Sequence, residues 1–125
     1  MKQTNIFIAA ALSLFALTAA QAQQNPQKAL KVPFKYALGK SLFEENCAAC
    51  HGKFGNGSKQ GPPLMNPIYK PSHHGDAAFF RAPMQGARAH HWKFGDMPPV
   101  AGMSKRKLTK IVPYIRWMQQ QYGIK

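Results

Sequence analysis

Acidic residues are scarce in this sequence of 125 residues, which has 4 Asp and Glu against 17 Lys and Arg. The formal net charge is +13 with neutral histidines. So few carboxylates leave little material for acid–base catalysis, which argues against an enzyme. The positive field favours encounters with acidic partners and weakens as salt rises. Because the sequence has no nucleic-acid-binding motif, we expect its partners to be acidic proteins and not nucleic acids.

Cysteine is equally scarce, since the chain contains two. Two cysteines cannot build a disulfide framework, so their local spacing matters more than their number. The sequence also lacks the alternating polar and apolar pattern of strands, and it has no internal repeat. A domain this small often needs a metal, a cofactor or disulfides to be stable. Disulfides are excluded as the main support, which leaves a metal or a cofactor.

The longest apolar run is too short to span a membrane. It covers residues 6–20, whereas a spanning helix needs about 20 apolar residues. Lys2 precedes the run, and Ala20-Gln21-Ala22 follows with the small-x-small pattern of a signal peptidase site. We therefore expect residues 1–22 to be a cleavable signal peptide, with export to the periplasm and no stable membrane insertion after cleavage. An uncleaved anchor is the alternative.

The rest of the chain divides into an arm and one domain. Residues 23–34 are polar, contain two prolines and show no periodicity, which is typical of a flexible arm. Residues 35–125 have the length of one small domain. We expect that domain to be a monomer.

Three helices are predicted in the domain, with no strand. The first covers Tyr36–Asn46, and the second is short, from Ala77 to Arg81, with Asp76 as its cap. The third begins after Ser104, a good N-cap residue. Pro113 should bend this last helix or make it restart near Thr109. Its buried stripe is predicted to contain Leu108, Ile111, Ile115, Met118 and Tyr122. The fold class is all-α, with three to five helices joined by long Gly/Pro loops.

The segment Cys47-Ala48-Ala49-Cys50-His51 has the C-x-x-C-H pattern of covalent haem attachment. If the first helix continues through it, Cys47, Cys50 and His51 lie at i, i+3 and i+4 on one side. Two thiols can then add to the haem vinyl groups while the imidazole reaches the iron. A thioredoxin-like thiol pair or half of a zinc site are the alternatives. Neither is favoured, because a second C-x-x-C and an alternating strand–helix pattern are both missing.

Over residues 36–122 the chain resembles the class I c-type cytochromes. Beyond the C-x-x-C-H motif, Gly39 and Phe43 resemble the family's first-helix contact surface, and Tyr114 resembles the aromatic part of its last helix. The resemblance implies a small cytochrome c-like fold wrapped around one covalent haem c with its iron, held on one side by His51. The run Gly61-Pro62-Pro63-Leu64 resembles the loop whose proline carbonyl accepts a hydrogen bond from that imidazole. Pro62 would then orient His51.

The second axial ligand is implied by another resemblance. The run Gly95-Asp96-Met97-Pro98-Pro99 is similar to the family's methionine loop, which makes Met97 the expected ligand. Prolines stiffen such a loop, and a thioether favours reduced iron. Other candidates stay open. They are Met65, Met84, Met103, Met118, His73, His74, His90 and His91.

Two histidine pairs have no clear role in the sequence. His73-His74 and His90-His91 flank the short predicted helix and could hold a surface copper or zinc ion. The plainer interpretation is that they are exposed residues that gain charge as pH falls. Trp92, beside the second pair, could bond a haem propionate through its indole N–H.

These features predict a soluble periplasmic carrier of single electrons with His51 and Met97 as axial ligands. It would dock transiently to acidic reductases or oxidases through small interfaces. The candidate docking charges are Lys53, Lys59, Lys70, Arg88 and Lys93. The alternative is a haem subunit, a small peroxidase-like haem enzyme or a ligand sensor with an open sixth position on the iron.

Overall fold

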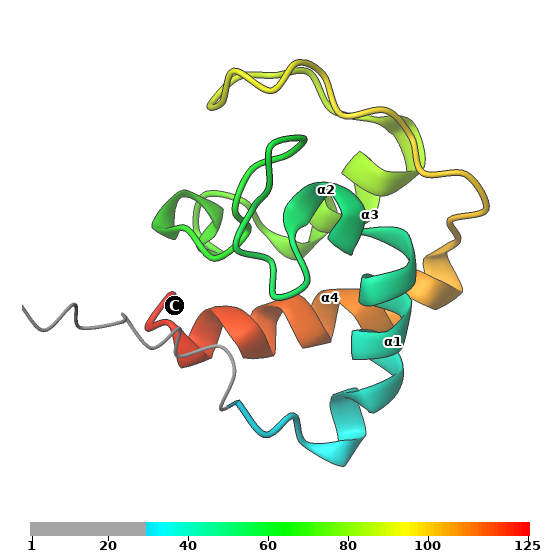
Figure 1. Cartoon of the computed structure of the whole chain (residues 1–125), viewed down its shortest axis with the longest axis vertical. Coiled ribbons are helices and arrows are strands. Elements are labelled where there is room, and N and C mark those ends of the chain that lie inside the picture. Colours follow the sequence, from blue (N-terminus) through cyan, green and yellow to red (C-terminus); the bar gives the residue numbers. More distant parts are fainter. Residues whose placement is uncertain (1–29) are drawn as a thin grey trace, which may run out of the picture.

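The computed structural model describes residues 30–125, so the predicted signal peptide and most of the predicted arm lie outside the described residues (Figure 1). Residues 30–125 contain four α-helices and two short 3-10 helices. In chain order these are η2 (Phe34–Tyr36), α1 (Ala37–Asn46), α2 (Ala48–His51), η3 (Pro67–Tyr69), α3 (Asp76–Gln85) and α4 (Lys105–Gln121).

The all-α prediction is confirmed. Within residues 30–125, extended pairing is limited to one isolated antiparallel bridge between Ala87 and Met97. Figure 1 shows α4 along one side of the domain, α1 crossing it, and the loop after α3 arching on the far side of α2 and α3. No helix of this part of the chain has the length and apolar character needed to cross a membrane.

The core is organised by the crossing of α1 and α4. Gly39 is buried at the crossing, and a Cβ there would overlap the carbonyl oxygen of Lys110 and lie 2.9 Å from the Cβ of Tyr114. One turn later, Phe43 packs edge-on against Tyr114 with ring centroids 5.7 Å apart. The predicted contact surface of Gly39 and Phe43 with the last helix is therefore confirmed. Only glycine allows the two backbones to approach so closely.

Helix α4 is continuous through Pro113, so the predicted restart near Thr109 is wrong. Pro113 is exposed, and the hydrogen bond that it removes lies on the side of the helix that faces water. Apolar residues on both sides of the proline are buried and hold the helix together. Ser104 is the N-cap as predicted, and its hydroxyl accepts a hydrogen bond from the Lys107 N–H.

Helix α3 is longer than predicted and differs at its start. It runs to Gln85 and ends at Gly86, whose φ of +82° favours glycine. Gly75 is the N-cap residue, so the prediction that Asp76 caps this helix is wrong. Asp76 is the first helical residue, and its carboxylate instead accepts a hydrogen bond from the Arg116 guanidinium at 2.7 Å. A tertiary partner thus replaces the local cap.

Candidate functional site

The cysteine motif lies on a turn that is separate from α1. Helix α1 ends at Asn46 as predicted and does not continue through the motif, because the φ and ψ of Cys47, −127° and −31°, interrupt the helix between α1 and α2. The carbonyl oxygen of Cys47 nevertheless accepts hydrogen bonds from the N–H groups of Cys50 at 3.2 Å and His51 at 2.9 Å. The turn is therefore helical, and Cys47, Cys50 and His51 all line the same cavity.

His51 is buried, and one of its ring nitrogens is bonded to the backbone. Nδ1 lies 2.9 Å from the carbonyl oxygen of Pro62, which is the contact that the resemblance implies. A carbonyl can only accept, so Nδ1 carries the proton and Nε2 keeps its lone pair. Burial lowers the pKa of His51, although the Pro62 hydrogen bond acts in the opposite direction. The imidazole is thus prepared as a neutral ligand through Nε2.

The two thiols differ in exposure, since Cys47 is half-buried and Cys50 is exposed. Burial, with Cys50 as a neighbour, raises the pKa of Cys47 to about 11. Redox-active thiol pairs require the opposite shift, so the thioredoxin-like alternative is not supported. In the described part of the chain, no cluster of metal-ligating side chains contains Cys47 or Cys50. The alternative of a zinc site therefore lacks the further ligands that it would need.

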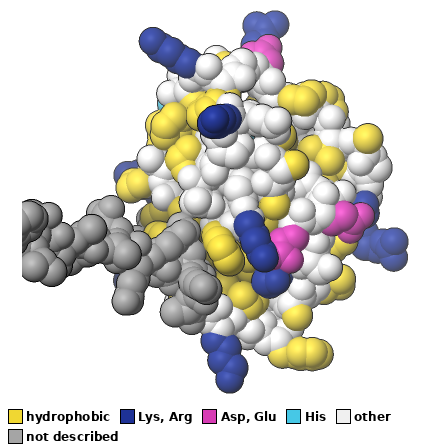
Figure 2. All heavy atoms as spheres, viewed as in Figure 1, with side chains coloured by type: hydrophobic (Ala, Val, Ile, Leu, Met, Phe, Trp, Pro, Cys, Tyr) yellow, Lys and Arg dark blue, Asp and Glu magenta, His cyan; other side chains and the backbone are white. Residues whose placement is uncertain are grey.

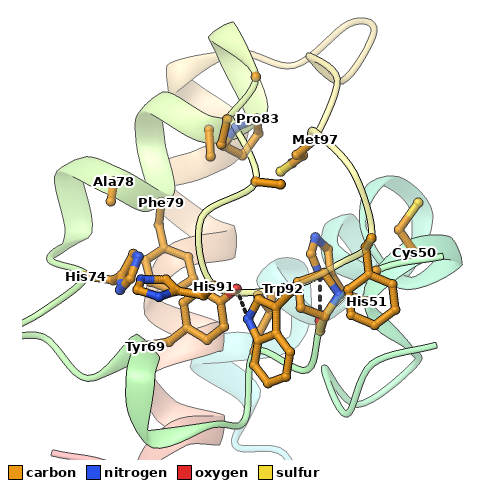
Figure 3. A pocket seen from close by; sticks show the side chains of 18 of the residues that line it. Cys50, His51, Tyr69, His74, Ala78, Phe79, Pro83, His91, Trp92 and Met97 are labelled. Carbon is orange, nitrogen blue, oxygen red and sulfur yellow. Dashed lines mark hydrogen bonds between the residues drawn. The ribbon is translucent and has the colours of Figure 1, made fainter. Parts of the chain in front are cut away.

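A cavity of about 720 Å³ separates the cysteine turn from α3 and the loop that follows it (Figure 3). This volume lies within the range of roughly 300–1,000 Å³ that is usual for cofactor sites. Most of the wall is apolar, from Leu64, Phe79, Leu108, Ile111 and Ile115. A haem fits these residues, because the cavity combines an apolar wall, two thiols and an imidazole with a free Nε2.

Met97 lies across the cavity from His51 (Figure 3). Its backbone is held by the bridge to Ala87, with N–H···O distances of 2.8 and 2.9 Å, and two prolines follow it. Among the methionines of residues 30–125, Met97 alone lines the cavity. The rival methionines at positions 65, 84, 103 and 118 are placed elsewhere, whereas the four rival histidines line one edge of the cavity.

Trp92 also lines the cavity, but its N–H already has a partner. The indole Nε1 donates a hydrogen bond to the Tyr69 hydroxyl at 3.1 Å. This bond links the loop after α3 to η3 and leaves the phenol hydrogen free to turn to another acceptor. The predicted bond from Trp92 to a haem propionate stays a prediction, with Tyr69 as an additional candidate donor.

Arg116 holds one wall of the cavity, and sequence reasoning missed it. Besides Asp76, its guanidinium donates to the carbonyl oxygens of Tyr69 at 2.8 Å and His74 at 2.5 Å. It also stacks over Phe79, 4.5 Å from the ring centroid. These contacts fix the loop before α3 against α4. No periodic signal in the sequence marks Arg116, because it lies beside the buried stripe and not in it.

Replacing Arg116 with alanine is expected to lower the free energy of unfolding by about 1–2 kcal/mol. The His74 carbonyl would lose the Arg116 donor, and the Tyr69 carbonyl would keep only the longer bond from Gln119 Nε2 at 3.4 Å. The exposed ion pair with Asp76 adds little to this figure. Arg116→Lys should recover less than half of the loss, since an ammonium cannot reproduce the planar fork. Urea unfolding followed by circular dichroism measures both, with Arg106→Ala on the exposed side of α4 as the control. Equal stabilities of Arg116→Ala and Arg106→Ala would contradict this role.

Comparisons with known proteins agree with the geometry. The cytochrome c family profile matches residues 36–119. The chain is 50% identical over 36 residues to Cbb3-type cytochrome c oxidase subunit CcoP of Azospirillum brasilense and of Azospirillum sp. (strain B510). Each match covers 29% of this chain and 12% of the relative, so the chain spans a small part of those proteins. No solved structure matches. The chain belongs to the cytochrome c family, whose domains bind haem c covalently and transfer electrons.

Proposed function

We propose that this protein is a monomeric carrier of single electrons with one haem, bound through Cys47 and Cys50 and ligated by His51 and Met97. The observation that carries the proposal is that one apolar cavity is lined by both thiols, by the imidazole and by a single methionine on the opposite side. When bound, haem c supplies a one-electron iron couple. The axial positions would both be filled by the protein, which suits electron transfer and not substrate binding.

Each ligand is held by its own local structure. The Pro62 carbonyl fixes the tautomer and the ring orientation of His51. The bridge to Ala87 and the two following prolines hold Met97, which lowers the entropy lost on ligation. A thioether ligand raises the reduction potential relative to a second imidazole.

The basic surface supports transient docking to acidic redox proteins. All five candidate docking residues are exposed: Lys53, Lys59, Lys70, Arg88 and Lys93. Figure 2 shows lysine and arginine side chains projecting around one face, with acidic side chains beside some of them. Arg88 also lines the cavity, which places a positive charge beside the haem site. Electron transfer should therefore slow as ionic strength rises.

We place the protein in the periplasm on the basis of residues 1–22, which have the pattern of a cleavable signal peptide. Covalent haem attachment also needs an oxidising compartment with maturation machinery, for which the periplasm is the natural location. N-terminal sequencing of the secreted protein tests this placement, with Gln23 as the expected first residue.

Replacing Met97 with alanine tests the ligand assignment. In the oxidised wild-type protein we expect a weak far-red band from sulfur to iron, and no carbon monoxide binding after reduction. Met97→Ala should remove the band and open the reduced protein to carbon monoxide. The matched control is Met84→Ala, because Met84 is a partly exposed methionine outside the cavity. Its spectra should equal those of the wild type.

If the wild-type protein already binds carbon monoxide and lacks the far-red band, the carrier proposal fails. A peroxidase-like enzyme or a ligand sensor would then be favoured, and peroxide turnover would separate these two. If Met97→Ala keeps the band, another methionine is the ligand.

The partial match to an oxidase subunit supports a second candidate, a haem subunit of a larger redox complex. Sedimentation of the protein purified from its native host under mild conditions distinguishes the two. A carrier should sediment as a haem-containing monomer, whereas a subunit should sediment with its complex.

A further inference from the structure

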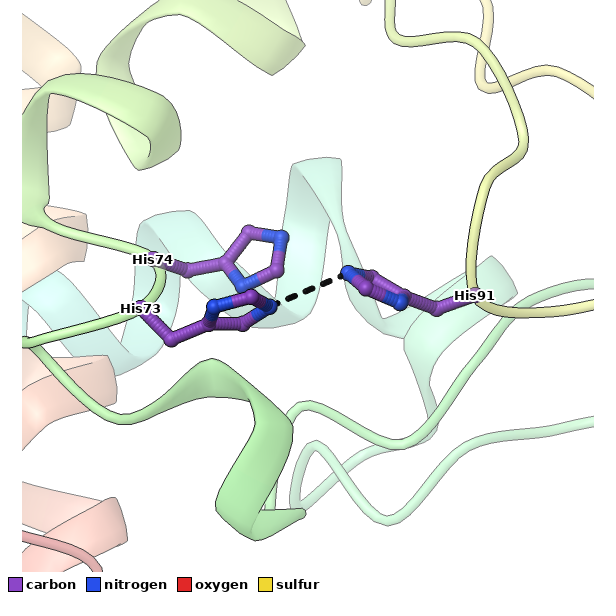
Figure 4. A group of neighbouring side chains, drawn as sticks. All are labelled: His73, His74 and His91. Atoms are coloured by element: carbon purple, nitrogen blue, oxygen red, sulfur yellow. Dashed lines mark hydrogen bonds between the residues drawn. The ribbon is translucent and has the colours of Figure 1, made fainter.

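Four histidines from two separate loops meet at the edge of the haem cavity. His73 and His74 precede α3, and His90 and His91 lie in the loop after it. His73, His74 and His91 each offer a ring nitrogen, and these three nitrogens lie within 4.8 Å of one another (Figure 4). His90 joins them through His74, with 3.3 Å between the two Nε2 atoms. The cluster contains no carboxylate and no thiol.

The backbone fixes the tautomers of two of these rings. His74 Nδ1 lies 2.8 Å from the carbonyl oxygen of Ile68, and His90 Nδ1 lies 2.7 Å from that of Arg88. Both Nδ1 atoms must therefore donate, which leaves both Nε2 atoms as acceptors in the neutral rings. Two acceptors that face each other at 3.3 Å repel unless a proton or a cation lies between them. Bonding of Nδ1 to a backbone carbonyl is also the usual outer support of metal-ligating histidines.

The spacing of the facing Nε2 atoms matches tetrahedral coordination of a metal ion. The His73 and His91 Nε2 atoms are also 3.3 Å apart. Two ligands of a tetrahedral zinc ion, each at about 2.0–2.1 Å, are separated by roughly 3.3–3.4 Å. Cis ligands of a square-planar copper ion would be closer, at roughly 2.8 Å. A shared proton can satisfy one facing pair at a time, whereas a single cation can accept the lone pairs of all four rings.

We propose that His73, His74, His90 and His91 form a binding site for one divalent transition-metal ion, with the tetrahedral preference of zinc. The nitrogens of His73, His74 and His91 already lie within 4.8 Å of one another, and the His90 ring, which faces His74, would have to turn toward them to supply the fourth ligand. Such an ion would join the loop before α3 to the loop that carries Met97. Bound metal should therefore stabilise the loop that presents the second axial ligand. The hydrogen bond from Trp92 to Tyr69 already links this loop to η3, and the metal would add a second link.

The test is a zinc titration of the haem-loaded protein against a competing chelator. We expect one zinc per chain, a higher melting temperature with zinc, and an X-ray absorption spectrum with four nitrogen neighbours at about 2.0–2.1 Å. The double variant His73→Gln/His91→Gln should lose at least about 100-fold in affinity and the thermal shift, and His90→Gln at least about tenfold.

Matched controls distinguish the loss of a zinc ligand from the loss of a nearby positive charge and from a change at the haem. Arg88→Gln and Lys93→Gln remove charges beside the cluster without removing an imidazole, so zinc affinity should not fall. The haem spectrum should stay unchanged in the histidine variants, because none of these rings would be an axial ligand. The proposal is overturned if His73→Gln/His91→Gln keeps wild-type affinity, or if the absorption spectrum shows fewer than three nitrogen neighbours.

Discussion

Replacing both Cys47 and Cys50 with serine is expected to abolish covalent attachment of haem. The two thiols line the cavity beside His51, and no other thiol exists in the chain. The haem of the double variant should therefore separate from the chain on denaturation in acid, whereas the wild-type chain should keep it. Mass spectrometry of the denatured protein measures this directly, and it also counts haems, of which we expect one.

The matched control is Ala49→Ser, which adds a hydroxyl group between the two cysteines at an exposed position of the same turn. This variant should keep its haem. Haem retained on the denatured Cys47→Ser/Cys50→Ser chain would contradict the attachment site. A wild-type mass with two haems would contradict the proposal of a single haem.

The loss of haem should also unfold much of the domain. The cavity of about 720 Å³ has a mostly apolar wall, and without the haem this wall would border an unfilled space. The apolar wall must therefore collapse or admit water when the haem is missing. We expect the haem-free double variant to show reduced helicity in its circular dichroism spectrum.

The general fold could be predicted from the sequence because its strongest signals are periodic. The stripe on α4 that includes Leu108, Ile111 and Ile115 is buried as its spacing predicts. Ser104 begins the same helix by a local hydrogen bond, which depends on the neighbouring sequence alone. Gly39 could be placed through its resemblance to a known contact surface, since a single glycine has no periodic meaning.

Predictions failed where a tertiary contact overrides a local preference. Asp76 was expected to cap α3, but Gly75 is the N-cap residue, and the Asp76 carboxylate accepts a hydrogen bond from the Arg116 guanidinium of α4. Pro113 was expected to bend α4 or to make it restart near Thr109, but no restart occurs, because buried residues on both sides of the proline keep the helix continuous. The first helix ends at Asn46 as predicted, and the motif that follows forms a separate turn, α2, after Cys47.

The site could be predicted in part. C-x-x-C-H is a local pattern, so Cys47, Cys50 and His51 are visible without a structure. The two histidine pairs converge because the loops before and after α3 approach each other. No local spacing in the sequence indicates this approach. Met97 could be selected over the other methionines through the resemblance of its loop, Gly95-Asp96-Met97-Pro98-Pro99, and the cavity supports that choice because no other methionine of residues 30–125 lines it.

Replacing Gly39 with valine is expected to cost about 3 kcal/mol or more in the free energy of unfolding. The new Cβ would overlap the Lys110 carbonyl oxygen and lie 2.9 Å from the Cβ of Tyr114, so α1 and α4 must separate. The nearest obstacle is helix backbone and not the end of a flexible side chain, so it cannot yield locally. Urea unfolding of the haem-loaded protein, followed by circular dichroism, gives the change.

A pair of alanine variants distinguishes the effect of crowding at the helix crossing on stability from the effect of helix propensity. Alanine favours a helix over glycine by about 1 kcal/mol and over serine by less, so propensity alone predicts that Gly39→Ala and Ser41→Ala both stabilise α1. Ser41 is exposed on the same helix, and its alanine variant should follow that prediction. Gly39→Ala should do the opposite, because its Cβ meets the same backbone as that of valine. If Gly39→Ala is as stable as Ser41→Ala, the two helices do not cross as closely as described, and the cavity they support must be shaped by other contacts.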